Sequence, residues 1–335
     1  MTFGDDKRVP PAAPHLPISD LAGTNVLVTG ASGFIGSHTV RALIAAGAKV
    51  HALVRHSSSV ERLVELDASI DLHTGDVTNR EALDVCFHSA RPEVVFHLAA
   101  DTSARHDEGG FEGIDLSVAV NLTGTLNVIR AAATPGSQVK RVIRTGSIGE
   151  YGNAAIPFGE LSRERPTSTY SASLVATTQF CQALQPALPF VLVTMRPALV
   201  YGPSQGPGFF ISQLIRNCLD GTDFEMTGGS RRRDFIYVGD VVAGLLAAAS
   251  SDGLGGEILN LATGQGHALT DVADLVVRLT GSAIEIKRGA RSASVSDPSD
   301  LISSTVRAAE RLGWRAQTGL EEGLRRTVEW ERARG

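Results

Sequence analysis

Residues 26–36 read Val26-Leu-Val-Thr-Gly30-Ala-Ser-Gly33-Phe-Ile-Gly36, and this stretch decides the fold class of the chain. An apolar run leads into three glycines spaced G-x-x-G-x-x-G, and a helical pattern follows. We therefore expect a strand, a tight turn and a helix whose N-terminus can receive a phosphate group. Gly30 permits the turn, Gly33 lets backbone N–H groups approach a pyrophosphate, and Gly36 allows close packing of helix and strand. The alternative is a tight strand–helix connection that binds no ligand.

Strands and helices alternate after this loop. Apolar, β-branched runs predict strands at 49–54, 70–74, 93–100, 139–145 and 190–196, with helical patterns between them. Such alternation indicates an α/β fold, a doubly wound parallel sheet of the Rossmann type. Glycine and proline increase after Tyr201, which indicates a smaller, irregular C-terminal substrate lobe. The expected division is a flexible leader (1–22), a dinucleotide-binding domain (23–195 plus 234–263) and a substrate-binding lobe (196–233 plus 264–331).

Composition excludes several classes of protein. The chain has 335 residues, of which 43% are hydrophobic, so it can bury a large core. A net charge of −5 does not favour nucleic-acid binding. The widely spaced Cys86, Cys181 and Cys218 do not have metal-ligand spacing and predict reduced thiols in a cytoplasmic protein. We expect no metal site, and we find no signal peptide or membrane-spanning run.

The residues after the second expected strand bear on the choice of dinucleotide. An acidic residue there would bind the adenosine ribose 2′-hydroxyl and favour NAD. This chain has Arg55 followed by His56 and three serines. A guanidinium suits a 2′-phosphate, so NADP is expected in preference to NAD, unless Arg55 is only a solvated surface residue. Asp76 and Val77 are expected near the adenine, and Asp76 could also cap the next helix.

The chain resembles the extended short-chain dehydrogenase/reductase family, in its branch of nucleotide-sugar epimerases, dehydratases and ketoreductases. The motifs that carry this resemblance extend over residues 23–331. They are Thr29-Gly-Ala-Ser-Gly-Phe-Ile-Gly36, Gly75-Asp-Val77, His97-Leu-Ala-Ala100, Asn121-Leu-Thr-Gly-Thr-Leu-Asn127, Thr145-Gly-Ser147, Tyr151-Gly152, Tyr170-Ser-Ala-Ser, Arg196-Pro197, Tyr201-Gly-Pro203, Arg233-Asp-Phe-Ile-Tyr-Val238, Leu312-Gly-Trp314 and Leu320-Glu-Glu-Gly-Leu324. The resemblance and the loop together imply these dinucleotide-binding residues: Gly30, Ser32, Gly33, Phe34, Ile35, Gly36, Arg55, Asp76, Val77, Leu98, Ala99, Ala100 and Tyr170.

The resemblance also implies a catalytic pair. Ser147 matches the hydroxyl that hydrogen-bonds the reacting sugar oxygen, and Tyr170 matches the acid/base that exchanges a proton with that oxygen. The family lysine, four residues after the tyrosine, is replaced by Leu174. A free tyrosine has a pKa of about 10, and a nearby cation is what normally makes its ionisation easier.

Three interpretations of this departure remain open at the sequence level. The positive nicotinamide ring could suffice for a slower enzyme, another group such as Arg105 or His106 could substitute, or the chain could bind without turnover. Because protonated Tyr170 is already the general acid for a carbonyl reduction, we expect a ketoreductase before an epimerase. Ile148 and Gly149 stand where 4,6-dehydratases carry acidic residues, which argues against a dehydratase.

The resemblance assigns the remaining site residues to a nucleotide-sugar substrate. Thr102, Ser147, Tyr201, Arg233 and Arg291 are expected to contact it, and the two arginines suit its diphosphate. Leu199 replaces an asparagine that is frequent in the family. His97 is expected to be a core residue of its strand. The family also implies a homodimer, and neither nucleic acid nor a membrane is expected as a partner.

Overall fold

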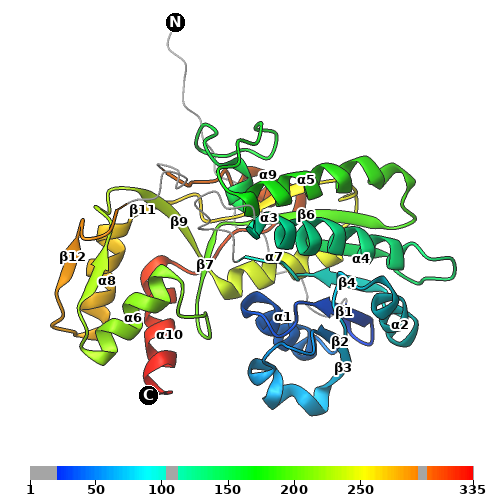
Figure 1. Cartoon of the computed structure of the whole chain (residues 1–335), viewed down its shortest axis with the longest axis horizontal. Coiled ribbons are helices and arrows are strands. Elements are labelled where there is room, and N and C mark those ends of the chain that lie inside the picture. The colour runs from blue at the N-terminus through cyan, green and yellow to red at the C-terminus, as the bar shows by residue number, and fades with distance from the viewer. Residues whose placement is uncertain (1–20, 103–111, 293–299, 335) are drawn as a thin grey trace, which may run out of the picture.

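Seven parallel strands form the central sheet of the larger lobe (Figure 1). The structure is a computed structural model, and it describes residues 21–102, 112–292 and 300–334. The strand order is β10-β6-β5-β4-β1-β2-β3, so the chain leaves β1 in one direction and continues from β4 in the other. This order confirms the doubly wound fold; in such folds ligands bind where the strand order reverses, which here is between β1 and β4. The strands are β1 (Asn25–Thr29), β2 (Lys49–Val54), β3 (Ile70–Thr74), β4 (Val94–His97), β5 (Arg141–Thr145), β6 (Val191–Pro197) and β10 (Ile258–Leu261).

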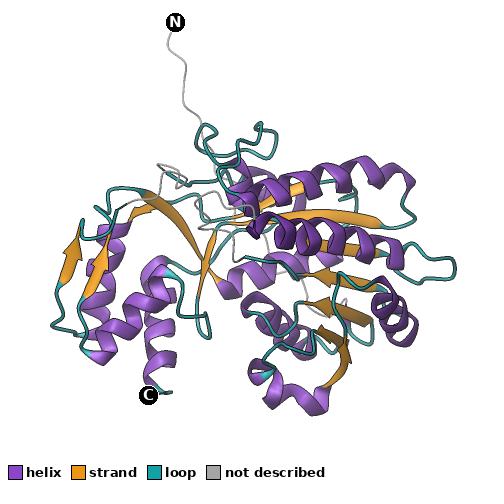
Figure 2. Cartoon of the chain, viewed as in Figure 1, coloured by secondary structure: helices purple, strands orange, loops and turns teal. Residues whose placement is uncertain are grey.

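Helices cover both faces of this sheet (Figure 2). One face carries α1 (Phe34–Ala45), α7 (Val238–Ser250) and α9 (Val306–Leu312). The other carries α2 (Arg80–Ala90), α3 (Glu112–Ser117), the π-helical turn η4 (Val118–Gly124), α4 (Thr125–Ala132) and α5 (Thr169–Leu184). Short 3₁₀ segments are η2 (Glu61–Ser69), η5 (Ile148–Tyr151) and η6 (Gln185–Ala187).

Alternation along the strands explains the two apolar layers. Val26 and Val28 of β1 belong to the core shared with α1 and α7, whereas Leu27 belongs to the core shared with α2 and α4. Successive side chains of a strand point to opposite faces, so a sheet covered on both sides needs apolar residues at both parities. Full burial of each such side chain stabilises the fold by about 1.5–3 kcal/mol.

The smaller lobe lies beside the carboxyl ends of the large sheet (Figure 1). Its three-stranded sheet has the order β11-β9-β7, and a second pair joins β12 to β8. The strands are β7 (Leu199–Tyr201), β8 (Phe224–Met226), β9 (Arg232–Tyr237), β11 (Gly266–Ala268) and β12 (Ile286–Arg288). The helices α6 (Phe210–Asp220), α8 (Leu269–Thr280) and α10 (Leu320–Arg332) complete it.

The chain crosses between the lobes in a slightly different way from the expected division. All of β9 pairs within the smaller sheet, so the return to the larger lobe comes at α7 rather than at residue 234. Buried Ala308 and Leu312 of α9 join the core of the larger lobe, although the sequence division assigned them to the smaller one. Sheet pairing and apolar packing decide these memberships, and both depend on residues distant in the sequence.

Candidate functional site

The glycine loop connects β1 to α1 at the carboxyl edge of the large sheet. In the strand register Thr29 lies opposite Leu53 of β2 and His97 of β4, so the segments after all three meet at this edge. Gly33 is exposed, and Phe34 and Ile35 at the start of α1 are half-buried. The first N–H groups of a helix have no partner within the helix, so α1 presents donors where a pyrophosphate can reach them.

Two of the three glycines are required by close backbone approach. Gly30 has a φ of +68°, and a Cβ on it would lie 2.6 Å from the Ala99 backbone nitrogen. A Cβ on Gly36 would overlap the Gly30 carbonyl oxygen. The tight packing at Gly36 is therefore against the loop's own backbone. A larger side chain at either position would push the loop backbone aside, so glycine is what allows the tight turn that brings the first N–H groups of α1 to the sheet edge, where a dinucleotide can bind.

Arg55 follows β2 directly and lies beside the start of the glycine loop. Its side chain is exposed, and its Nε donates a weak hydrogen bond to Ser58 Oγ at 3.4 Å. Val54, at the end of the strand, is buried. The position next to the loop thus holds an exposed guanidinium and a hydroxyl, and both can donate to a phosphate.

Asp76 and Val77 lie in a loop that side chains hold in place. Asp76 Oδ1 accepts from Thr78 N and Thr78 Oγ1, both at 2.8 Å. The cap of α2 is Asn79, whose side chain accepts from Ala82 N, so Asp76 does not cap this helix. Val77 is buried, and its carbonyl accepts from Asn127 Nδ2 at 3.1 Å.

His97 connects the cofactor loop to the helices behind it. Its Nδ1 lies 2.7 Å from Thr29 Oγ1 and its Nε2 lies 2.9 Å from Thr125 Oγ1. Thr29 Oγ1 also accepts from Ala99 N, which fixes the Leu98–Ala100 segment beside Gly30. Burial lowers the pKa of His97 to about 3, and the charge of Arg144 adds to the effect. His97 is therefore a neutral core residue, as its strand pattern predicted.

Ser147 and Tyr170 lie on elements that pack together one strand further along the sheet, at β5 and α5. Ser147 follows β5 and caps η5, and Tyr170 is the second residue of α5. The Gly149 backbone lies between Ser147 and the start of α5: a Cβ there would be 3.3 Å from Ser147 Oγ and 3.0 Å from the Oγ of Ser171, the residue after Tyr170. Tyr170 is 9% exposed, so only a small part of its side chain reaches solvent.

Leu174 packs directly against Tyr170 in a small apolar cluster and is 2% exposed. On the sheet side of the helix, Arg144 Nη2 donates to the Leu174 carbonyl oxygen at 3.4 Å. Arg144 is itself buried and donates to Thr178 Oγ1 at 3.0 Å. Sequence inspection missed Arg144, since a single arginine in a strand carries no pattern. Arg105 and His106 lie outside the described residues.

The residues predicted to bind the substrate differ in exposure, and the structure does not gather all of them into one site. Tyr201 is 1% exposed, and its hydroxyl donates to the Leu320 carbonyl at 3.2 Å. Its side chain therefore packs within the smaller lobe, and its contact with substrate stays a prediction. Arg233 is buried and donates to the Arg232 carbonyl, whereas Arg232 is an exposed partner of Asp300. Thr102 and Arg291 are exposed.

Within residues 21–102, 112–292 and 300–334, no cluster of histidine, cysteine or acidic side chains could hold a metal. The three cysteines are buried free thiols. None of the helices in these ranges is long and apolar enough to cross a membrane.

A doubly wound sheet with a glycine cradle and a serine–tyrosine pair at its carboxyl edge defines a dinucleotide-dependent enzyme of the oxidoreductase or epimerase type. The chain belongs to the NAD dependent epimerase/dehydratase family, whose profile matches residues 26–262.

Individual relatives agree with this family. UDP-glucose 4-epimerase of Mycolicibacterium smegmatis is 32% identical over 317 residues, which cover 91% of this chain and 98% of that protein. The crystal structure of UDP-glucose 4-epimerase from Thermotoga maritima with UDP-glucose has a TM-score of 0.85 at 29% identity, covering 92% of this chain and 99% of the other. The structure of MoeE5 with UDP-glucuronic acid and NAD has a TM-score of 0.82 at 33% identity, with the same coverage.

Proposed function

We propose that this enzyme reduces the carbonyl of a nucleotide-linked 4-keto sugar, with NADPH as the hydride donor. The observation that carries the proposal is Leu174, which packs against Tyr170 where a lysine would assist ionisation. A carbonyl reduction needs the tyrosine as a proton donor, whereas an epimerase must first remove a proton from an alcohol. The site therefore keeps the group that a reductase needs.

The chain's own residues supply binding and proton transfer. The backbone of Gly30–Gly36 would hold the pyrophosphate, and the bound NADPH supplies the hydride. Tyr170 would give its proton to the substrate oxygen as it becomes an alkoxide. Ser147 Oγ already accepts from Gly149 N at 3.0 Å, so its hydroxyl proton is available to the same oxygen.

Arg55 supports NADP as the preferred dinucleotide. A related structure contains NAD, so the two cofactors must be separated by measurement. Replacing Arg55 with Asp should weaken NADPH binding about 10- to 100-fold and leave NADH binding within about threefold, because only NADPH loses a charge-assisted contact. Titration of nucleotide fluorescence measures both constants. Equal losses would remove Arg55 from cofactor selection.

The test of the reaction is a panel of UDP-, dTDP-, GDP- and CDP-linked 4-keto sugars. Stoichiometric oxidation of NADPH, with one reduced sugar formed per cofactor, supports the reductase. The epimerase is the second candidate, because the relatives compared above include UDP-glucose 4-epimerases. Interconversion of two sugar nucleotides without net cofactor use would establish it instead.

A third candidate is a protein that binds nucleotide sugar without turnover. It predicts bound cofactor, no conversion of any panel member and activity gained by Leu174→Lys. Dehydration is disfavoured because Ile148 and Gly149 supply no carboxylate, and the Glu150 carboxylate is fully buried against other groups.

The remaining assignments concern substrate contacts and assembly. We propose Arg233 and Arg291 for the diphosphate and Thr102 for the sugar; Arg291→Ala should then raise KM about tenfold with little change in kcat. We also propose a cytoplasmic homodimer, supported by the free thiols and by exposed Leu116, Val118 and Phe180 on α3, η4 and α5. Light scattering coupled to size exclusion measures the oligomeric state.

A further inference from the structure

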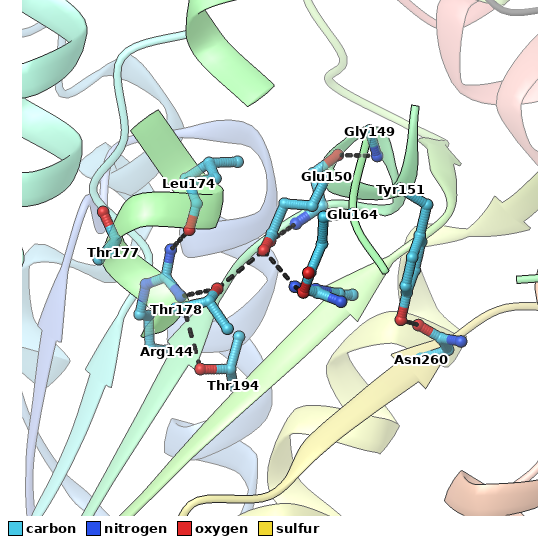
Figure 3. A network of polar contacts seen from close by, with 12 residues as sticks. Arg144, Gly149, Glu150, Tyr151, Glu164, Leu174, Thr177, Thr178, Thr194 and Asn260 are labelled. Carbon is cyan, nitrogen blue, oxygen red and sulfur yellow. Dashed lines mark hydrogen bonds and ion pairs between the residues drawn. The ribbon is translucent and has the colours of Figure 1, made fainter. Parts of the chain in front are cut away.

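A buried polar network lies beneath α5, between the sheet and the helix that carries Tyr170 (Figure 3). The face of the sheet that α5 covers carries Arg144 of β5 and Thr194 and Arg196 of β6. The earlier positions of these two strands on the same face are apolar, with Val142 and Leu192. Arg196 and Glu150 are both fully buried. Removing charged groups from water is unfavourable unless they are paired and hydrogen-bonded. This network therefore needs a reason beyond apolar packing.

Glu150 is the centre of the network. Its Oε1 accepts from the backbone N–H of Ser147 at 3.0 Å. Its Oε2 accepts from Thr178 Oγ1 at 2.8 Å and pairs with Arg196 Nη2 at 2.5 Å. One carboxylate thus contacts the catalytic serine's own peptide, the Tyr170 helix and a neighbouring strand.

The local backbone is adapted to this carboxylate. A Cβ on Gly146 would overlap Glu150 Oε1, so only glycine lets the side chain fold back beneath the loop. Ser147 Oγ accepts from Gly149 N while Glu150 accepts from Ser147 N, which makes a capping box around η5. Both the peptide and the hydroxyl oxygen of Ser147 are therefore held in place.

A capping box accounts for only one oxygen of Glu150. The second oxygen reaches across to α5, where Arg144 donates to the same threonine hydroxyl and to the Leu174 carbonyl. We propose that Glu150 is a positioning residue, which fixes Ser147 relative to the helix that carries Tyr170. This inference rests on the proposed catalytic roles of Ser147 and Tyr170.

The main test compares Glu150→Ala with Glu164→Ala. Glu164 pairs with the same Arg196 nitrogen at 2.9 Å but is not among the hydrogen-bond partners of Ser147, so it controls for loss of the ion pair. Glu150→Ala should lower kcat about 10- to 100-fold, because small misplacements of catalytic groups have effects of this size. NADPH affinity and KM should stay within about threefold, and Glu164→Ala should keep kcat within about threefold. Equal kcat losses in the two variants would overturn the proposal.

A double-mutant cycle separates positioning from general destabilisation. In a Ser147→Ala background, Glu150→Ala should lower kcat less than about twofold further, because the group that it positions is gone. Glu150→Gln keeps the side-chain length and an acceptor for Ser147 N, so it should recover most of the activity lost in Glu150→Ala. A full additional loss in the Ser147→Ala background contradicts the proposal.

Thr178→Val provides a milder variant if Glu150→Ala does not fold. It keeps the shape of the side chain and removes the hydroxyl that joins Glu150 to α5. We expect about a threefold to tenfold loss of kcat that disappears in the Ser147→Ala background. Unchanged kcat in folded Thr178→Val overturns the link to α5.

Hydrogen exchange tests whether Glu150 positions Ser147 even if the wild-type protein turns over no substrate. The Ser147 amide should exchange at least about tenfold faster in Glu150→Ala, or in Glu150→Val if the alanine variant is unfolded, than in wild type and Glu164→Ala. An inactive wild type with this pattern refutes the proposed reaction and keeps the positioning role. Unchanged exchange in the Glu150 variant refutes the positioning role whatever the reaction is.

Discussion

The glycine loop and the site around Ser147 and Tyr170, called the α5 site below, lie at the same edge of the sheet and are built in opposite ways. The loop positions its ligand groups with backbone: Gly30 and Gly36 approach other main-chain atoms too closely for any side chain. The α5 site depends on side chains from β5, β6, η5 and α5, which meet in a buried network (Figure 3). The first arrangement needs three glycines within seven residues, whereas hydrogen bonds of the second join residues up to 50 positions apart in the chain.

This difference determines how each region tolerates change. A backbone cradle fails when any atom is added, because there is no side chain that can move away. A side-chain network can lose an uncharged member, such as the Thr178 hydroxyl, and keep its fold, whereas loss of a buried charge leaves its partner unpaired. Dinucleotide binding and turnover should therefore be separable by mutation.

The largest effect is expected at Tyr170. Tyr170→Phe should lower kcat about 10²- to 10⁴-fold through loss of the general acid, with NADPH affinity kept within about threefold. Steady-state kinetics and nucleotide titration measure the two quantities. Tyr201→Phe is the matched control, since its hydroxyl bonds the Leu320 carbonyl, and kcat should stay within about twofold. A comparable loss in Tyr201→Phe would show that this hydroxyl acts at the substrate site.

Gly36→Ala should have the next largest effect, and on binding rather than on chemistry. The added Cβ overlaps the Gly30 carbonyl oxygen, so the loop must shift. The free energy of unfolding should fall by about 1–3 kcal/mol and NADPH affinity by at least about tenfold. Gly208→Ala, with no atom near its added Cβ, should change neither quantity by more than about 0.5 kcal/mol. Unaltered affinity in Gly36→Ala would mean that the loop is not a rigid cradle.

His97, which contacts Thr29 of β1 and Thr125 of α4, gives a pH-dependent test. Its folded pKa of about 3 lies below the ordinary 6.5, so the unfolded chain binds the extra proton as the pH falls. The stabilisation is complete above pH 6.5 and is lost toward pH 3. Between pH 7 and 5 wild type should lose about 2 kcal/mol more unfolding free energy than His97→Gln, measured in urea. The control is His88→Gln, at an exposed position, which should lose as much unfolding free energy as wild type between pH 7 and 5.

The smallest effect is expected from Leu174→Lys. A cation one turn from Tyr170 should move the alkaline limb of the kcat–pH profile down by about one pH unit. Leu174→Met preserves volume without charge and should keep the wild-type profile. If the lysine variant also keeps it, the charge at position 174 does not govern proton transfer in this protein.

Much of the fold could be predicted from local pattern. The strands expected at 49–54 and 70–74 have those bounds as β2 and β3, because short apolar runs between turns specify them. Residues 118–133 have helical periodicity, but this segment begins with the π-helical turn η4, where the Asn121 carbonyl accepts from the Thr125 and Thr177 side chains. Those contacts involve a second helix, so periodicity along one segment cannot reveal them.

The candidate site also has one part that local sequence pattern predicts and another that depends on contacts between distant elements. Ser147-Ile-Gly-Glu150 has the spacing of a capping box, so half of the role of Glu150 was visible in the sequence. Its contacts with Thr178 and Arg196 were not, since no spacing rule links a loop, a helix and a strand. The motif gave the position of Tyr201 but not the direction in which its side chain packs, which is into the core of the smaller lobe.

The sequence by itself determined the glycine cradle, the doubly wound order of elements and the identity of Leu174, because each depends on neighbouring residues. Only the tertiary structure decided what surrounds Tyr170. There Leu174 closes the space against the ring, Arg144 lies behind the helix and Glu150 holds Ser147. These contacts arise when β5, β6 and α5 pack together, and burial makes each unpaired charge unfavourable enough that the partners must meet.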